Sequence, residues 1–290
     1  MHSRPRRSAL YMPGSNPRAM EKARTLPADV LIFDLEDAVA PDAKAAARDR
    51  ILAALGAGGY GRREIVVRVN GLGTTWGAED VRAVARSGAD ALLLPKVESV
   101  ETVRQAAYVL AEAGAPASLA IWCMIETPLG ALNAAALAGA HSRLGCLVMG
   151  TSDLAKDLHA RHTRERLPLL TALGFCLLAA RAHGLAILDG VHLDLNDDEG
   201  FAAACRQGAE LGFDGKTLIH PKTIAAANAA FAPRAADVAE AKRLIAAHGA
   251  AIAEGKGVVV VDGRLVENLH VEEARRLIAL DAAIEALGTA

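Results

Sequence analysis

Aromatic residues are scarce, at 3% of the 290 residues, although hydrophobic residues make up 52%. The apolar mass is therefore mainly Ala, Leu, Val and Ile, which suits alanine-rich helices packed on a buried sheet. No apolar run approaches the roughly 20 residues that span a bilayer, and the N-terminus lacks the apolar stretch of a secretory signal. A net charge of -2 provides no bulk field for nucleic acid. We therefore expect a cytoplasmic protein without membrane or nucleic-acid partners.

Several common site motifs are also missing. No GxGxxG follows the first strand-like run, which counts against a dinucleotide-binding domain. The nine histidines form no HExxH pair, and no two cysteines form a CxxC pair. A zinc site is therefore not expected, and the cysteines are interpreted as reduced, buried thiols. They are Cys123, Cys146, Cys176 and Cys205.

Strand-like and helix-like segments alternate along the chain. Parallel strands need such crossovers, and eight βα units in roughly 230 residues favour a (β/α)8 TIM barrel over an open sheet. The eight strand-like runs are 8–12, 29–35, 64–69, 91–95, 119–125, 144–150, 185–191 and 216–220. Helices are expected, among others, at 16–23, 43–55, 78–87, 100–113, 168–183 and 199–211.

The pattern changes after the eighth unit. Residues 233–254 are expected to form a long helix, and the following KGVVVVDGRLVENL is typical of a β-hairpin with Asp262-Gly263 at its turn. A last helix is expected at 271–287. We therefore predict a barrel domain at 1–232 and a helix–hairpin–helix extension at 233–290.

Polar residues stand where three of the strand-like runs end. Arg68 lies near the end of 64–69, Glu126 directly follows the fifth run, and Asp153 comes soon after the sixth. Active sites of TIM barrels lie at this end of the strands. Two carboxylates without nearby His or Cys favour Mg²⁺, and a guanidinium suits a carboxylate or enolate oxygen. The residues alone also allow helix caps for the two acids and an ion pair for Arg68.

Other charged residues follow neighbouring runs. Glu36 and Asp37, in DLEDAV, could orient metal-bound water, or they could pair with Arg48, Arg68 or Lys96. Lys96, in LLLPKVES, could form a Schiff base as in class I aldolases. An ion pair is the favoured interpretation for Lys96.

Two polar turns could bind anions. PGSN at 13–16 opens a helix with Arg18 and Lys22 close by, and helix N-termini bind anions such as phosphate. Gly150 and Thr151 open a loop whose N–H groups could hold a small carboxylate beside the metal. PGSN could equally be an ordinary helix cap, and the loop at Gly150 could equally be an ordinary βα turn.

Taken together, these stretches resemble the CoA-ester lyase branch of the HpcH/HpaI aldolase and citrate lyase β-subunit superfamily. The resemblance covers about residues 7–221 in the family's order and extends to the C-terminal GVVVVDGRLVENLHVEEA. The matching stretches are RSALYMPGSNPRAMEKA, DVLIFDLEDAVAPDAK, VVRVNGLGT, LLLPKVES, MIETPLGALN, LVMGTSDLAKDL and FDGKTLIHP.

The resemblance implies specific roles for the residues at the strand ends. It implies that Glu126 and Asp153 bind Mg²⁺ and that Arg68 contacts the thioester or its enolate oxygen. The loop residues Gly150 and Thr151, singled out above from their own pattern, would then bind the substrate carboxylate. The small substrate partner would be a 2-oxo acid bound beside the metal.

Two further implications concern CoA and assembly. The PGSN turn and the first helix would lie near CoA, which indicates Asn16, Arg18 and Lys22. In this family an acid on the C-terminal hairpin, typically aspartate, completes the site of a neighbouring subunit. The corresponding residue here is Glu267, whose extra methylene moves the carboxylate by roughly one bond length. A homo-oligomer is therefore expected, as a trimer or a dimer of trimers.

The implied reaction is Mg²⁺-dependent, reversible carbon–carbon cleavage of a short 3-hydroxyacyl-CoA to an acyl-CoA and a 2-oxo acid. Malyl-CoA, β-methylmalyl-CoA and citramalyl-CoA would suit it. A (3S)-malyl-CoA thioesterase, or a citrate lyase β subunit acting on a carrier-bound acyl group, would use the same scaffold. A non-catalytic acyl-CoA-binding role is disfavoured because Arg68, Glu126 and Asp153 are all intact.

Overall fold

The structure is a computed structural model that describes residues 4–255 and 257–288. By its internal contacts the chain divides into two compact units. Residues Arg6–Phe231 form the larger one. The smaller one contains the rest of the described chain, mainly from Ala232 onward.

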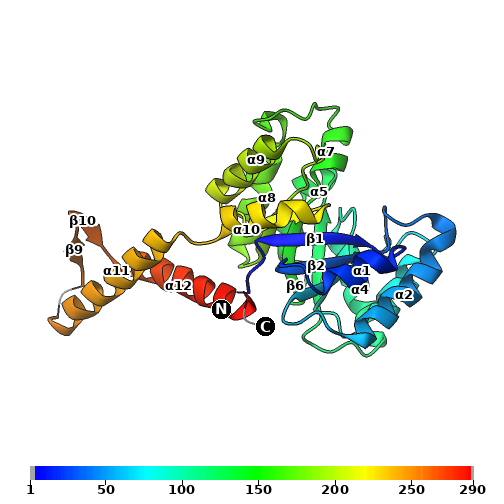
Figure 1. The fold of residues 1–290 in the computed structure, drawn as a ribbon, viewed down its shortest axis with the longest axis horizontal. Coiled ribbons are helices and arrows are strands. Elements are labelled where there is room, and N and C mark those ends of the chain that lie inside the picture. Colours follow the sequence, from blue (N-terminus) through cyan, green and yellow to red (C-terminus); the bar gives the residue numbers. More distant parts are fainter. Residues whose placement is uncertain (1–3, 256, 289–290) are drawn as a thin grey trace. The chain divides into compact units, whose positions relative to one another are not determined.

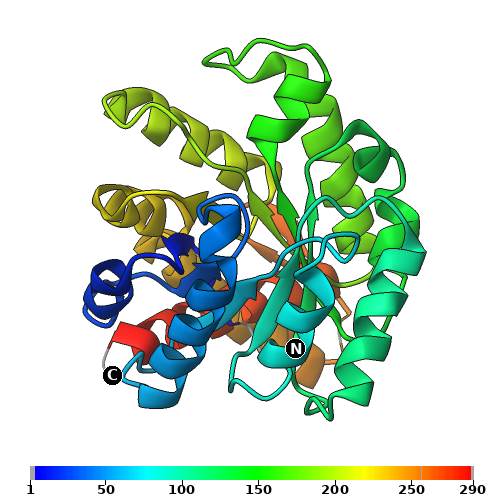
Figure 2. The same cartoon turned by 90° about the vertical axis from the view of Figure 1, so that its right-hand side faces the viewer.

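The larger unit is a closed barrel of eight parallel strands (Figures 1 and 2). The strands follow one another in chain order, and β8 pairs back with β1, where Ser8 lies opposite Lys216. This confirms the expected TIM barrel, and every strand lies within two residues of its expected bounds. The strands are β1 (Ser8–Pro13), β2 (Val30–Asp34), β3 (Glu64–Arg68), β4 (Ala91–Leu94), β5 (Ala120–Ile125), β6 (Leu144–Met149), β7 (Ala186–Asp189) and β8 (Gly215–Leu218).

Helices alternate with the strands and surround the barrel (Figure 2). The expected helices are present, with ends shifted by up to three residues. The α-helices of this unit are α1 (Pro17–Ala23), α2 (Lys44–Ala57), α3 (Gly77–Val84), α4 (Val100–Glu112), α5 (Pro128–Leu132), α6 (Ala134–Ala138), α7 (Thr151–Asp157), α8 (Leu170–Ala182), α9 (Asp198–Leu211) and α10 (Ile224–Phe231). Short 3-10 turns, η1 (Pro41–Ala43), η2 (Leu167–Leu169) and η3 (Pro221–Thr223), precede three of them.

Polar side chains and glycine determine where several helices begin and end. Ser99 and Asp197 accept hydrogen bonds from the backbone N–H groups of Thr102 and Gly200, which would otherwise lack partners in the first turn. Helix α9 ends at Gly212, whose φ of 103° is a left-handed conformation that favours glycine. The chain can therefore turn sharply into β8.

The core has two layers because the strands are buried on both faces. One layer fills the barrel with alternate strand residues such as Ile32, Leu93 and Val148, and includes the fully buried Trp122. The other lies between the strands and the helices and is larger. Arg6 caps the inner layer: its guanidinium pairs with Glu64 at 2.6 Å and lies 5.1 Å from the Trp122 ring.

The smaller unit contains two helices and a hairpin. Helix α11 (Ala235–Ala253) and helix α12 (Asn268–Gly288) pack on each other. Between them, β9 (Val259–Val261) pairs antiparallel with β10 (Arg264–Val266). Asp262, with φ 50°, and Gly263, with φ 77°, form the turn, and positive φ at both positions is what an Asp-Gly hairpin turn requires. Helix α12 begins three residues before its expected start at 271.

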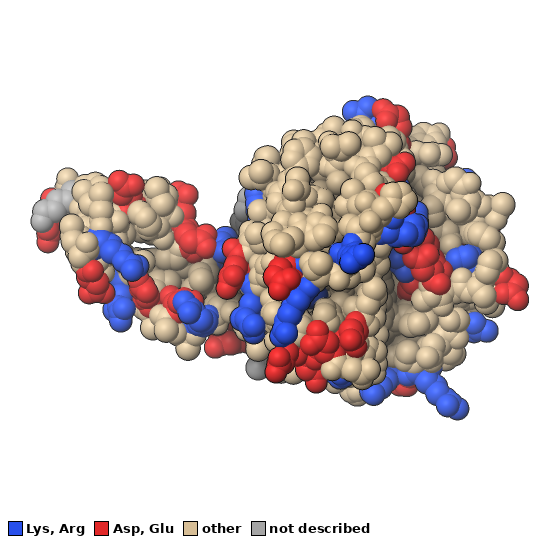
Figure 3. Space-filling model, turned by 90° about the horizontal axis from the view of Figure 1, so that it is seen from above, with Lys and Arg blue, Asp and Glu red and all other residues tan. Residues whose placement is uncertain are grey.

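Charges of both signs are interspersed on the face seen in Figure 3, in keeping with the net charge of -2. The described residues contain no helix that is both long and apolar enough to cross a membrane.

Candidate active site

A cavity of about 420 Å³ opens where the barrel strands end. The closed parallel barrel brings the C-terminal ends of all strands to one face, so side chains far apart in sequence meet there. Arg68, Glu126, Asp153, Gly150 and Thr151, all expected at the site, line this cavity. The other lining residues are Tyr11, Pro13, Asp34, Asp37, Ala38, Met124, Met149, Ser152, Val191, Leu193 and Ile219.

Arg68 is held by a two-pronged ion pair with Asp34. Its Nε and Nη2 donate to the two Asp34 carboxylate oxygens at 2.7 and 2.6 Å. The pairing follows from the sheet register, because Asp34 and Arg68 are opposite residues at the ends of β2 and β3. The guanidinium also lies 4.9 Å from the ring of Tyr11. Such clamping fixes the plane of the guanidinium and leaves Nη1 as the nitrogen turned toward other groups.

Glu36 and Asp37 meet Arg68 Nη1, as one of the two interpretations of DLEDAV anticipated. Nη1 lies 2.8 Å from Glu36 Oε2 and 3.4 Å from Asp37 Oδ2. The Glu36 side chain is mostly buried, and burial raises the pKa of its carboxyl. Asp37 is 63% exposed and faces the cavity. Of the two other expected partners, Lys96 also pairs with Glu36, at 3.1 Å, whereas Arg48 pairs with Asp80 at 2.9 Å.

The Glu126 carboxylate is buried beside Gly150. Burial raises the pKa of Glu126 to about 7, although the nearby Lys96 opposes the shift. A Cβ on residue 150 would lie 2.2 Å from the Glu126 Cβ and 2.6 Å from its Oε2. Gly150 donates its own N–H to the Ile125 carbonyl at 2.9 Å. Its contribution to the site is therefore the room that it leaves for Glu126.

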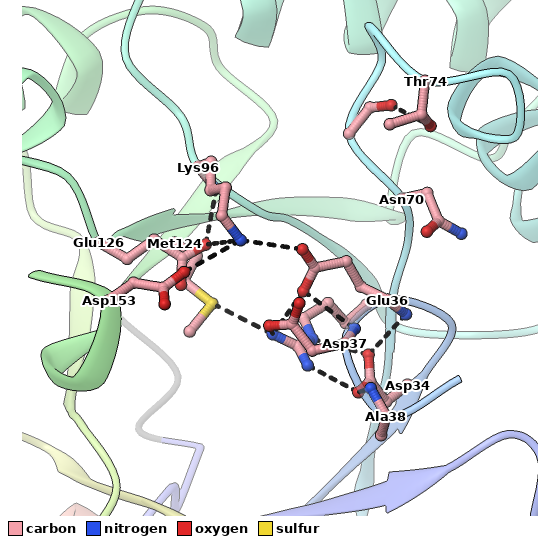
Figure 4. A network of polar contacts seen from close by, with 12 residues as sticks. Asp34, Glu36, Asp37, Ala38, Asn70, Thr74, Lys96, Met124, Glu126 and Asp153 are labelled. Carbon is pink, nitrogen blue, oxygen red and sulfur yellow. Dashed lines mark hydrogen bonds and ion pairs between the residues drawn. The ribbon is translucent and has the colours of Figure 1, made fainter. Parts of the chain in front are cut away.

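The Lys96 ammonium lies between the carboxylates of Glu36, Glu126 and Asp153, as the close view in Figure 4 shows. Its Nζ lies 3.1 Å from Glu36 Oε1, 3.1 Å from Asp153 Oδ2 and 3.8 Å from Glu126 Oε1. Its backbone N–H donates to Glu126 Oε1 at 2.8 Å. Burial alone would lower the pKa of Lys96, but the surrounding carboxylates raise it above its ordinary value. These distances are those of the ion pair that was favoured for Lys96, and a raised pKa disfavours the neutral amine that a Schiff base requires.

The donor set of the site suits a hard divalent cation. Glu126 and Asp153 direct carboxylate oxygens toward the same ammonium, so a cation at that place can meet both. The Ser152 hydroxyl lines the same cavity, is buried and has no hydrogen-bond partner among the described residues. Residues 4–255 and 257–288 hold no group of three His, Cys, Asp or Glu able to bind a metal. Two carboxylates with the remaining positions left to water and substrate fit Mg²⁺.

Thr151 packs against the turn after β7, at Gly190 and Val191. The Thr151 hydroxyl lies 3.5 Å from the Val191 carbonyl, and a Cβ on Gly190 would lie 2.3 Å from that hydroxyl. Buried Lys216 donates to Asp189 at 2.8 Å and to the Gly190 carbonyl, which holds the turn in place. The start of α7, which carries Asp153, therefore rests on a fixed surface.

One wall of the cavity was not anticipated from the sequence. Tyr11 and Met124 come from inside the barrel, and the Met124 sulfur lies 3.8 Å from the Tyr11 hydroxyl and 3.9 Å from Arg68 Nη1. Val191 and Leu193 add apolar surface from the β7 loop. Met124 therefore contributes a thioether to the cavity wall, in contact with Arg68.

The expected CoA and hairpin residues lie outside this cavity lining. Asn16 caps α1 by accepting from the Ala19 N–H at 3.1 Å, while Arg18 and Lys22 are exposed on α1. Helix α1 directly follows Pro13, which lines the cavity. Glu267 lies in the smaller unit just before α12, where its N–H donates to His270 Nδ1 at 3.0 Å.

A closed parallel barrel with clustered carboxylates at its strand ends is the architecture of a TIM-barrel enzyme. The family model for HpcH/HpaI aldolase/citrate lyase matches residues 7–221. The chain therefore belongs to the HpcH/HpaI aldolase/citrate lyase family, which confirms the resemblance found in the sequence.

Individual relatives extend over nearly the whole chain. A (3S)-malyl-CoA thioesterase of Cereibacter sphaeroides (strain ATCC 17025) is 52% identical over 284 residues, covering 98% of this chain and 97% of that one. CitE of Mycobacterium tuberculosis, solved with magnesium, acetoacetate and coenzyme A, has a TM-score of 0.77 at 29% identity, covering 97% and 100% of the two chains. The citrate lyase β subunit of M. tuberculosis, solved with oxaloacetate and magnesium, has a TM-score of 0.67 at 32% identity, covering 80% of this chain and all of that one.

Proposed function

We propose that this protein is a Mg²⁺-dependent thioesterase that hydrolyses malyl-CoA, or a close homologue of it, to the free hydroxy acid and CoA. The observation that carries this proposal is the 52% identity with a (3S)-malyl-CoA thioesterase across almost the full length of both chains. From the sequence alone, carbon–carbon cleavage was the first expectation and hydrolysis the alternative. The identity reverses that order.

Glu126 and Asp153 would hold the magnesium ion. When bound, Mg²⁺ would supply Lewis-acid stabilisation for carboxylate and hydroxyl oxygens of the substrate. Glu36 and Asp37 lie on the other side of Lys96 and would orient water near the ion. Titratable acids gathered in one cavity and perturbed by burial are what an active site of this kind requires.

Arg68 would bind the thioester carbonyl oxygen. Asp34 fixes the guanidinium, so the donor is in place before charge develops, and fixed donors of this kind are worth about a hundredfold to a thousandfold in rate. Water adds to the carbonyl carbon, and the negative charge moves to the oxygen beside Arg68. The carbon–sulfur bond then breaks, and the CoA sulfur leaves as a thiolate that takes up a proton from solvent.

Glu267 of a neighbouring copy is our proposal for the base that removes the proton from the attacking water. The resemblance to the family supports this, because an acid of its C-terminal hairpin completes a neighbouring site. The extension at 233–290 would then make the active form a homo-oligomer, as a trimer or a dimer of trimers. Asn16, Arg18 and Lys22 would contact CoA from the rim of the barrel.

Carbon–carbon lysis is the second candidate. It is favoured by the family description and by the solved relative that holds oxaloacetate, a 2-oxo acid, together with magnesium. In this reaction Arg68 would stabilise the acyl-CoA enolate oxygen and Glu267 would protonate its carbon. A citrate lyase β subunit would need partner subunits as well.

Incubation with malyl-CoA, with and without Mg²⁺, separates the two reactions. Free thiol is counted while phenylhydrazine traps glyoxylate. Thiol without glyoxylate supports the thioesterase, whereas Mg²⁺-dependent glyoxylate without thiol shows a lyase. Glu126→Gln and Asp153→Asn should abolish turnover in folded protein, and Asp157→Asn on the same helix serves as the matched control. Activity retained in either of the first two variants would refute the metal assignment.

A further inference from the structure

Lys96 occupies the centre of the acid cluster, in an uncommon backbone conformation. Its φ is 47°, in the left-handed region that residues other than glycine seldom adopt. This conformation lets one residue use both of its donors at the site. The backbone N–H reaches Glu126 Oε1 at 2.8 Å, while the side chain turns its ammonium toward Glu36 and Asp153 at 3.1 Å each.

The charges around Lys96 do not balance in the metal-free protein. Three carboxylates, those of Glu36, Glu126 and Asp153, share this ammonium, and only Glu36 has Arg68 as a second cationic partner. Asp153 and Glu126, the two proposed metal ligands, have no other cation within ion-pair distance among the described residues. Without Lys96, two unneutralised carboxylates would lie close together in a partly buried cavity, which is unfavourable at low effective dielectric constant.

We propose that Lys96 is a built-in counter-ion of the metal site, which neutralises Glu126 and Asp153 in the metal-free protein and gives up those oxygens when Mg²⁺ binds. This inference rests on the metal assignment made under the proposed function. The Lys96 ammonium keeps a partner when it leaves the two ligands, because it also pairs with Glu36 Oε1 at 3.1 Å and Glu36 is not a proposed ligand. Lys96 therefore keeps the Glu126 and Asp153 carboxylates in place before the ion binds. Because the ion must displace the ammonium from these oxygens, its affinity is lower.

The proposal predicts the sign of an effect on metal affinity. If Lys96 competes with the ion, its removal strengthens Mg²⁺ binding. If it only supports the ligands, its removal weakens binding. An ammonium within 4 Å of both ligand carboxylates should lower the affinity at least about tenfold, given the interaction of charges at that distance.

Calorimetric titration of EDTA-treated protein with Mg²⁺ at pH 8 tests this without turnover. We expect Lys96→Met to bind Mg²⁺ at least about tenfold more tightly than the unaltered protein. Lys156→Met is the matched control: it removes the same charge from exposed Lys156, which pairs with Asp157 and not with the ligands. An unchanged or weaker affinity in Lys96→Met overturns the proposal. Absence of binding by the unaltered protein refutes the metal assignment itself.

Thermal unfolding gives a second readout that does not depend on calorimetric heats. In EDTA, Lys96→Met should melt below the unaltered protein, and saturating Mg²⁺ should raise its melting temperature by more than it raises that of the unaltered protein. Lys96→Gln, which keeps a hydrogen-bond donor but no charge, should behave like Lys96→Met and serves if the latter does not fold. An equal or smaller Mg²⁺-induced shift in both variants contradicts the counter-ion role.

Discussion

Gly150→Ala should disable the site while leaving the barrel folded. Gly150 has a φ of -98°, which any residue can adopt, so the effect of the change is steric. The new methyl carbon would lie 2.2 Å from the Glu126 Cβ and 2.6 Å from its Oε2. Carbon atoms in ordinary contact are about 3.5–4.0 Å apart, so the Glu126 Cβ, and with it the backbone that carries it, must move by more than about 1 Å. A displacement of that size can cost about a hundredfold in rate.

The assay measures kcat/KM for CoA release from malyl-CoA together with Mg²⁺ affinity. We expect kcat/KM to fall about a hundredfold and Mg²⁺ binding to weaken, with the circular dichroism spectrum unchanged. Gly174→Ala on α8 is the matched control, because a Cβ there meets no atom within 4 Å. It should leave catalysis unchanged and stabilise the helix by about 0.5–1 kcal/mol. Normal kinetics and metal affinity in Gly150→Ala would refute the placement of Glu126 as a ligand.

Four further predictions concern the cavity and the buried groups. Met124→Ala should raise kcat/KM for β-methylmalyl-CoA relative to malyl-CoA by about tenfold, which is what one methyl group is worth in an apolar pocket. Competition assays measure this ratio. An unchanged ratio would exclude Met124 from the acyl subsite. Burial raises the pKa of Glu126 to about 7, so Mg²⁺ affinity should fall by up to about tenfold per pH unit below that pH and level off above it, as calorimetry between pH 6 and 8 can show. The same shift makes the metal-free fold less stable as pH rises from the unfolded-state pKa, about 4.3, toward 7, and Glu126→Gln should remove this dependence. Burial also raises the pKa of the Cys205 thiol to about 11 and that of Cys176 to about 12, so a thiol reagent should count none of the four cysteines in native protein at pH 8 and all four after denaturation.

Much of the fold could be predicted because the apolar runs are short, strongly bounded and separated by helical segments. The strand ends also predicted which side chains would meet. Arg68, Glu126 and Asp153 are 27 or more positions apart, yet they line one cavity because parallel strands end at a common face. The alternation of strands and helices alone was sufficient for that inference.

Other parts of the site depend on features that a single sequence does not display. Asp34 clamps Arg68 only because β2 and β3 pair in a register that sets these two residues opposite each other. Tyr11 and Met124 sit in strands that are apolar on both faces, so no alternation of polar and apolar residues reveals which of them face the barrel interior. The position of Lys96 between three acids depends on its left-handed backbone conformation, and no local sequence motif predicts that conformation.

The pairing of β8 with β1 closes the barrel before the chain reaches Ala232. Every backbone ladder of the larger unit is therefore complete without the residues that follow. Changes in the segment after that point, the C-terminal hairpin included, therefore expose no edge of the barrel sheet. A barrel ending at Phe231, mixed with full-length protein whose Arg68 is replaced, would show whether one copy can supply its hairpin to another.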